Sequence, residues 1–226
     1  MVVLHLIIRK THVEKKLDLI IENYVAEQTD DVSALLRELL KETEAITGHS
    51  RWSIGQVEGK LMQFLVKVSG TRNAVEIGTF TGFSALMIAE ALPDDGLLVT
   101  CESRKEYAEI AWRYIKKSPH GRKIRLELKP AMQTLNEIAE NSVDFVFIDA
   151  DKPSYNRYFD EALRILRAGG FIFVDNVFWR NKIFKRKMTN ENAIAIAAFN
   201  AKVKAEDRVE KVMLSVRDGI YLIRKI

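Results

Sequence analysis

Two consecutive apolar stretches of this 226-residue chain each end in side chains that carry oxygen. Asp149 follows the stretch 143–148, and Asp175 and Asn176 follow the stretch 170–174. If the two stretches are neighbouring parallel strands, their carboxyl ends open at the same edge of a sheet and these side chains meet. Two carboxylates and an amide oxygen suit Mg²⁺, Mn²⁺ or Ca²⁺. The alternative is that Asp149 only caps a helix and that Asp175-Asn176 only begins a loop.

A lysine lies close to this candidate metal site in the sequence. Lys152 is three residues after Asp149, in the same loop. A lysine that is partly desolvated beside a dication has a lowered pKa, so it can act as a general base. The alternative is an ordinary solvent-exposed lysine. Asp151 and Tyr155, in the same segment, are further candidates for holding a ligand.

The segment 74–84 predicts a second ligand-binding feature, made of a short buried strand, a glycine turn and the start of a helix. Such a turn at the carboxyl end of a parallel strand is where open α/β sheets bind small molecules. Gly78 and Gly82 are spaced G-x-x-x-G, which is neither the dinucleotide-binding nor the phosphate-loop pattern. Glu102 ends the next apolar run, 20 residues after Gly82, where a carboxylate can accept hydrogen bonds from ribose hydroxyls. Together these features favour a nucleoside ligand without a diphosphate.

Two loops carry residues whose role the spacing leaves open. Trp52, in the irregular segment 48–55, is either a packing residue or a wall of the ligand site. The segment 179–187 is basic and contains aromatic residues, so it is either a solvated loop or a surface that attracts a phosphate-bearing or acidic substrate. No histidine follows a predicted strand, which argues against a catalytic histidine and against zinc; the four are His5, His12, His49 and His120.

The elements that must position these residues alternate between strand and helix signals. Three helices come first, over 13–28, 31–47 and 56–69, and Asp30-Asp31 separates the first two. Predicted strands cover 74–78, 97–102, 123–129, 143–149 and 170–175, and the helices between and after them cover 82–92, 104–117, 131–140, 154–167 and 191–205. The chain ends in two strands, 209–216 and 219–226, for which Asp218-Gly219 is a hairpin signal. This order predicts an α/β fold, with a mostly parallel sheet, helices on both faces and an antiparallel strand at the end.

Composition limits the remaining possibilities. A chain of this length with 47% hydrophobic residues suits one large domain. The formal net charge of +4 is too small and too diffuse to imply nucleic acid by itself. The single cysteine, Cys101, excludes an internal disulfide and fits a reducing, cytoplasmic location; we expect it to be a buried, small apolar side chain. The apolar start, 1–8, is too short for a membrane span and lacks a cleavage site, so neither an anchor nor a signal peptide is expected.

Taken together, the motifs resemble those of a known family. Glu-Ile-Gly-Thr-Phe-Thr-Gly-Phe-Ser, Phe-Ile-Asp-Ala-Asp-Lys, Asp-Asn-Val-Phe-Trp and Asp-Gly-Ile-Tyr-Leu-Ile-Arg-Lys are similar to motifs of the cation-dependent O-methyltransferases, which include the caffeoyl-CoA and catechol types and small bacterial relatives. The resemblance runs from about residue 52 to the end. It implies S-adenosylmethionine as methyl donor, a divalent metal such as Mg²⁺, a catechol-like acceptor and a homodimer. It also implies a Rossmann-like class I methyltransferase domain over 51–226, with a seven-stranded sheet whose last strand is antiparallel. A helical extension over 1–50 would then shape the substrate mouth or form dimer contacts.

The resemblance also implies roles for individual residues. Asp149, Asp175 and Asn176 are expected to bind the metal, and Lys152 is expected to take the proton of the acceptor hydroxyl beside Asp149. Glu102 is expected to hold the ribose of the donor, and the backbone near Ile54 its amino-acid end. The full set of residues expected to bind the donor is Trp52, Ile54, Glu76, Gly78, Phe80, Ser84, Glu102, Ala131, Met132, Asp149, Asp151 and Tyr158, with Ala131 and Met132 bordering the adenine.

Three differences from the family pattern concern, in turn, a wall of the site, the adenine contacts and the acceptor. Trp52 stands where many relatives have Met, which places it close to the reactive methyl. Lys129-Pro130-Ala131 replaces a common Gly-Asp-Ala, and the segment 179–190 is more basic than in typical relatives. The basic segment permits an alternative acceptor, a 5-hydroxyuridine of tRNA. A third interpretation is a non-catalytic S-adenosylmethionine-binding protein, which the intact metal set and Lys152 argue against.

Overall fold

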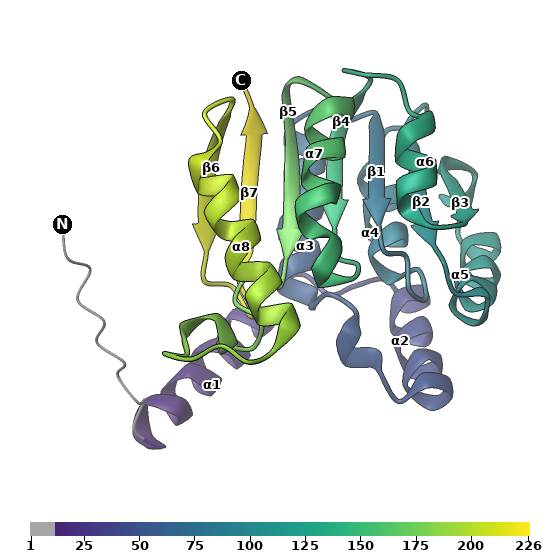
Figure 1. The fold of residues 1–226 in the computed structure, drawn as a ribbon. Coiled ribbons are helices and arrows are strands. Elements are labelled where there is room, and N and C mark those ends of the chain that lie inside the picture. Colours follow the sequence, from purple (N-terminus) through teal and green to yellow (C-terminus); the bar gives the residue numbers. More distant parts are fainter. Residues whose placement is uncertain (1–11) are drawn as a thin grey trace.

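A single sheet organises the computed structural model, which describes residues 12–226. Its seven strands lie in the order β3-β2-β1-β4-β5-β7-β6, as Figure 1 shows. The strands are β1 (Asn73–Ile77), β2 (Leu97–Glu102), β3 (Ile124–Leu128), β4 (Val143–Ile148), β5 (Leu166–Asp175), β6 (Val209–Leu214) and β7 (Ile220–Lys225). The first five run parallel, and β7 pairs antiparallel with both β5 and β6. The predicted fold class is therefore confirmed.

Helices cover both faces of this sheet (Figure 1). The helices of the structure are α1 (His12–Glu27), α2 (Ala34–Thr47), α3 (Gln56–Val68), α4 (Phe83–Ala91), α5 (Lys105–Lys117), α6 (Ala131–Glu137), α7 (Tyr155–Ile165) and α8 (Glu191–Ala205), and all but α1 pack against the sheet. Alternate residues of each strand point to opposite faces, and the strands contribute to two apolar clusters accordingly. Phe145, Phe147 and Phe173 pack with α2, α3, α4 and α5. Val146 and Ile148 pack with α6, α7 and α8 on the other face.

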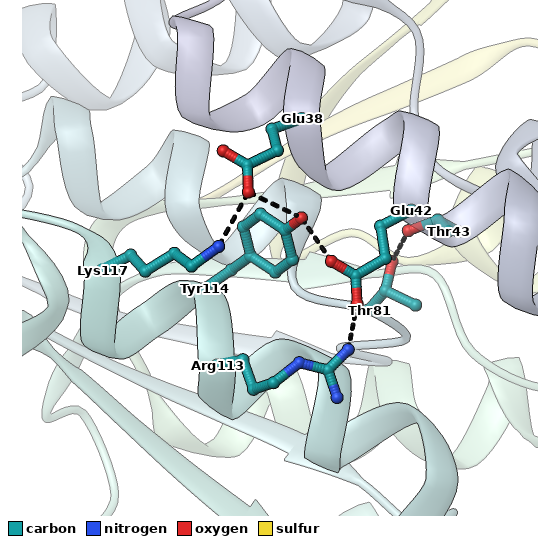
Figure 2. A network of polar contacts seen from close by, with 7 residues as sticks. All are labelled: Glu38, Glu42, Thr43, Thr81, Arg113, Tyr114 and Lys117. Carbon is teal, nitrogen blue, oxygen red and sulfur yellow. Dashed lines mark hydrogen bonds and ion pairs between the residues drawn. The ribbon is translucent and has the colours of Figure 1, made fainter.

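The polar network in Figure 2 joins α2 to α5 and to the glycine turn after β1. Tyr114 is fully buried on α5, and its hydroxyl donates to Glu42 of α2 at 2.6 Å. Glu42 also pairs with Arg113. Thr43 donates to Thr81 across a buried 2.9 Å hydrogen bond, and Thr81 belongs to the turn between β1 and α4. The helix α2 is therefore fixed directly to a segment that borders the candidate site.

The bounds of three predicted elements were wrong. Helix α2 begins after Ser33, whose hydroxyl accepts from Leu36 N, so Asp30-Asp31 does not cap it. Strand β5 begins at Leu166, earlier than predicted, because Leu166 already pairs with Val143 before a register shift. The last two strands are joined by five residues, 215–219, and not by a two-residue turn.

Helix α1 carries its apolar stripe on the outside of the molecule. Leu17, Ile20, Ile21 and Tyr24 form the predicted stripe, and each is more than half exposed. Phe64 and Val68 on α3 are 63% exposed as well. Among residues 12–226, no helix has the length and apolar character needed to cross a membrane.

Candidate active site

One large cavity opens at the carboxyl ends of β1, β2, β4 and β5. Its volume is about 1300 Å³, above the ~300–1,000 Å³ of a typical small-molecule pocket, so it has room for two ligands side by side. Of the residues for which the family resemblance implies a role, all but Glu76 line it, whereas Tyr155, the further candidate from the sequence, does not. The predicted residues that line it are Trp52, Ile54, Gly78, Phe80, Ser84, Glu102, Ala131, Met132, Asp149, Asp151, Lys152, Tyr158, Asp175 and Asn176.

Gly78 lets the ends of β1 and β4 approach each other closely. Its φ is +106°, and a Cβ at this position would lie 2.5 Å from the carbonyl oxygen of Asp149. Any side chain would therefore push apart the two strand ends that form the cavity floor. The amide of Asp149 donates to Ile77 O at 3.0 Å, which holds the two ends together.

Glu102 ends β2 with its carboxylate facing the glycine turn. One carboxylate oxygen accepts from Phe80 N at 2.8 Å, and the other accepts from Ser103 N and Arg104 N. Burial raises the pKa of Glu102, although these three backbone donors oppose the shift. A carboxylate has about four acceptor positions, so Glu102 keeps capacity to accept from a ligand in the cavity.

Two acidic side chains and an amide meet where β4 and β5 end. Strands β4 and β5 are neighbours, with Ile148 opposite Val174, so Asp149 and Asp175 follow paired positions. Burial raises the pKa of Asp175 well above its usual value, and the charge of Asp149 raises it further. Asn176 has a left-handed backbone, with φ of 62°. Its amide donates to Asp175 Oδ1 at 2.6 Å.

Lys152 lies against this acidic pair and is almost fully buried, with 6% of its surface exposed. Its ammonium donates to Asp149 Oδ1 at 2.8 Å and to the hydroxyl of Tyr155 at 2.6 Å. That hydroxyl in turn donates to the carbonyl oxygen of Asp175 at 3.1 Å. The interpretation of Lys152 as a solvent-exposed lysine is therefore wrong, because this chain of hydrogen bonds fixes the side chain inside the site.

Glu76 is the exception among the residues for which the family resemblance implies a role. It is fully buried behind the cavity wall and does not line it. One carboxylate oxygen accepts from Thr100 at 2.5 Å, and the other has no hydrogen-bond partner. Burial raises its pKa to about 7, and the charges of Asp149 and Glu102 add to the shift. The sequence pattern predicted that Glu76 lies in a strand, but it did not predict that the side chain is fully buried.

Aromatic rings form the wall of the cavity that faces β2. The rings of Trp52 and Phe80 lie 5.6 Å apart, and those of Phe80 and Tyr107 lie 4.6 Å apart. His49 stacks on the outer face of Trp52 at 4.0 Å. Trp52 is 47% exposed, so it is a wall of the cavity and not a packing residue. Cys101 is buried as predicted.

Sequence analysis missed the pair Arg217 and Glu58. Arg217 lines the cavity from the loop before β7, and its guanidinium pairs at 2.9 Å with Glu58, which is 1% exposed at the start of α3. The two residues are 159 positions apart. The only local signal was a glutamate three residues after Gly55, a spacing typical of a helix start.

Comparisons with known proteins agree on one family. Residues 26–226 match the model of the O-methyltransferase family, so the match begins inside the segment predicted as a helical extension. A probable caffeoyl-CoA O-methyltransferase 1 from Dictyostelium discoideum is 36% identical over 210 residues, covering 90% of this chain and 91% of that protein. Tricin synthase 2 from Oryza sativa subsp. japonica is 36% identical over 84% of this chain and 70% of that protein. The crystal structure of an O-methyltransferase from Bacillus cereus in complex with SAH has a TM-score of 0.83 and 28% identity, covering 91% of this chain and 97% of that one.

The raised pKa of Glu76 predicts a particular dependence of stability on pH. Its ordinary pKa is 4.5 and its folded pKa is about 7, so the folded state binds the proton more tightly. The stabilisation is complete below pH 4.5 and is lost as the pH rises through 7. Between pH 5 and pH 8 the free energy of unfolding of the unmodified chain should therefore fall by up to about 3 kcal/mol relative to that of Glu76→Gln. Urea unfolding at both pH values measures this, and parallel changes in the two proteins would contradict the assignment.

Proposed function

This chain belongs to the O-methyltransferase family, and we propose that it moves a methyl group from S-adenosylmethionine to a hydroxyl of a catechol-like small molecule with the help of a divalent cation. The observation that carries the proposal is the meeting of Asp149, Asp175, Asn176 and Lys152 in one cavity. Family membership and relatives named as caffeoyl-CoA O-methyltransferases support the reaction type. The acceptor and the metal are inferred from the residues of the site.

The donor is proposed to occupy the half of the cavity between the glycine turn and β2. Glu102 is suited to accept hydrogen bonds from the two ribose hydroxyls, because its carboxylate is fixed by three backbone amides. Ala131 and Met132 line the cavity at the start of α6, where they can border the adenine. When bound, S-adenosylmethionine supplies an electrophilic methyl group on a positively charged sulfur. The rings of Trp52 and Phe80 offer a face to that charge.

The chemistry of the acidic pair fits a divalent cation. Asp149 and Asp175 follow paired positions of β4 and β5. Burial raises the pKa of Asp175, and the charge of Asp149 raises it further. Asn176 adds a neutral oxygen to the two carboxylates. Within residues 12–226 no three His, Cys, Asp or Glu side chains are grouped so that they could hold a metal, so the proposed set depends on this amide oxygen as its third ligand. Hard oxygen ligands in this number favour Mg²⁺, Mn²⁺ or Ca²⁺ with water and acceptor oxygens completing the shell. A cation held there would lower the pKa of the acceptor hydroxyl.

Lys152 is proposed to receive the proton of that hydroxyl. The side chain is almost fully buried and its nitrogen lies 2.8 Å from Asp149 Oδ1. Tyr155 holds the amine in one position through a hydrogen bond on the side away from the cavity. The cavity walls bring donor and acceptor into line, so a large part of the rate enhancement comes from positioning.

The acceptor is proposed to carry a negative group at its outer end. Arg180 lines the cavity, and Lys185, Arg186 and Lys187 continue from it as exposed side chains. This basic segment also favours a second candidate function, methylation of a 5-hydroxyuridine in tRNA, since phosphates would be attracted to it. Nucleic-acid binding through such a segment weakens steeply with salt, whereas turnover of a small catechol does not.

We also propose that two copies of the chain associate through α1. The stripe of Leu17, Ile20, Ile21 and Tyr24 is a contiguous apolar surface on a helix that extends from the body of the molecule (Figure 1). Such surfaces are typical of protein interfaces. The family resemblance supports a second copy of the chain as the partner. Sedimentation equilibrium of the full chain should give a dimer, which Ile20→Glu with Tyr24→Glu should dissociate; a monomer at every concentration would contradict the proposal.

A screen for methyl transfer tests the reaction directly. Labelled S-adenosylmethionine is offered with catechols, flavonoids, CoA esters and bulk tRNA, with and without Mg²⁺. We expect label in a catechol-type acceptor, loss of turnover in excess chelator and its recovery when Mg²⁺ is restored. Full turnover in excess chelator would contradict the metal site. Labelling of tRNA alone, falling with salt, would favour the second candidate function.

Substitution of Lys152 tests the assigned base. Lys152→Met keeps most of the side-chain volume and removes the amine, so turnover at neutral pH should fall by about 10²–10⁴-fold. The affinity for S-adenosylhomocysteine should change by less than about threefold, because the amine touches the acceptor and not the donor. The control is Lys105→Met, since Lys105 is an exposed lysine on α5. An unchanged rate in Lys152→Met would exclude Lys152 as the base.

A further inference from the structure

The loop before β7 contains a residue held in an unfavourable backbone conformation. Arg217 has φ of 49°, in the left-handed region that favours glycine. The carbonyl of Val216 accepts from Gly219 N at 2.9 Å, which closes the turn around Arg217. A non-glycine residue keeps such a conformation only where its surroundings compensate the cost, and these positions concentrate at functional sites. The contacts of the Arg217 side chain identify that compensation.

The guanidinium of Arg217 holds a distant segment by three contacts. Nη1 donates to Ser53 O at 3.1 Å and to Glu58 Oε2 at 2.9 Å, and Nη2 donates to Arg51 O at 3.2 Å. The same oxygen of Glu58 accepts from Gly55 N at 2.8 Å. The segment 51–55 is thus fixed between the start of α3 and the loop before β7. Glu58 is 1% exposed, so its charge depends on Arg217 for compensation.

The segment that Arg217 holds contains the wall of the donor half of the cavity. Trp52 lies between the two carbonyl groups that accept from Arg217, and Ile54 follows them. Both side chains line the cavity. Because Trp52 is 47% exposed and stacks outward only on His49, burial alone does not fix its ring. The backbone contacts on either side of it therefore set where this wall stands.

The neighbour of Arg217 holds the opposite half of the site. The carbonyl of Asp218 accepts from Phe178 N at 2.9 Å, and its carboxylate accepts from Arg180 N at 2.5 Å. Gly219 O accepts from Val177 N at 3.2 Å. These amides directly follow Asp175 and Asn176. One short loop consequently connects the segment after the acidic pair to the wall formed by 51–55.

We propose that Arg217 is a positioning residue for methyl transfer, which sets the distance between the Trp52 wall and the acidic pair. This inference rests on the proposed function, because it takes the donor to lie against that wall. Arg217 touches neither reacting group in the proposed reaction. It acts through the backbone of residues 51–53, whose carbonyl groups accept from its guanidinium.

Replacement by glycine separates this role from a purely structural one. Arg217→Gly relieves the backbone strain and removes the guanidinium. Because the first change stabilises the fold and the second frees the segment 51–55, the melting temperature and the affinity for S-adenosylhomocysteine should not change in parallel. We expect the amides of residues 52–54 to exchange hydrogen at least about tenfold faster. We expect S-adenosylhomocysteine to bind at least about tenfold more weakly by calorimetry. Arg217→Lys should restore part of both. The control is Asn141→Gly. It also relieves a positive φ, of 53°, but does so away from the cavity, so it should change neither the exchange rates nor the affinity.

Hydrogen exchange and ligand affinity test different parts of the proposal. Unchanged exchange at 52–54 in Arg217→Gly and in Arg217→Met would overturn the positioning role, whatever the ligand. Faster exchange with unchanged affinity would overturn the link between this wall and the donor. If the unmodified chain bound no S-adenosylhomocysteine, the proposed function itself would be wrong, and the exchange measurement would still decide whether Arg217 holds the segment.

Discussion

The repulsion between the carboxylate of Asp149 and the buried carboxylate of Asp175 is the constraint on which the rest of the site depends. Asp149 and Asp175 are close together because β4 and β5 are adjacent parallel strands and each of the two residues directly follows one member of the pair Ile148 and Val174. Two like charges in a buried position are unfavourable unless a cation compensates them. The side-chain nitrogen of Lys152 lies 2.8 Å from Asp149 Oδ1. The proposed divalent ion would compensate the charges of both carboxylates, which explains why an acidic pair can be placed at this edge of the sheet.

The cavity is completed by segments that come from distant parts of the chain. The sheet supplies the floor, through Gly78 and Glu102. The walls come from 51–55 and from the loop before β7, which are joined by the ion pair of Arg217 and Glu58. Helix α2 is fixed to the glycine turn through Thr43 and Thr81 (Figure 2). The arrangement of the strands thus requires a few long-range polar contacts to fix the shape of the site.

The sequence predicted the sheet and the edge at which the site lies, because both follow from local periodicity and from the rule that parallel strands end together. It did not predict contacts between residues far apart in sequence. The Asp-Gly signal suggested a two-residue turn, but the loop 215–219 is longer because Arg217 reaches Glu58 and Asp218 reaches Arg180. The family resemblance implied that Glu76 lines the donor pocket, yet its side chain is fully buried and does not line the cavity. Periodicity identifies a buried strand but not the depth of one polar side chain within it.

Binding of Mn²⁺, followed by electron paramagnetic resonance, tests the central claim most directly. Mn²⁺ prefers the same oxygen ligands as Mg²⁺. The account predicts one tight site per chain, weakened at least about a hundredfold in Asp149→Ala and in Asp175→Ala. Asp151→Ala should bind normally, because this exposed neighbour is not among the proposed ligands. Equal Mn²⁺ affinity in the unmodified chain and in both variants would contradict the account.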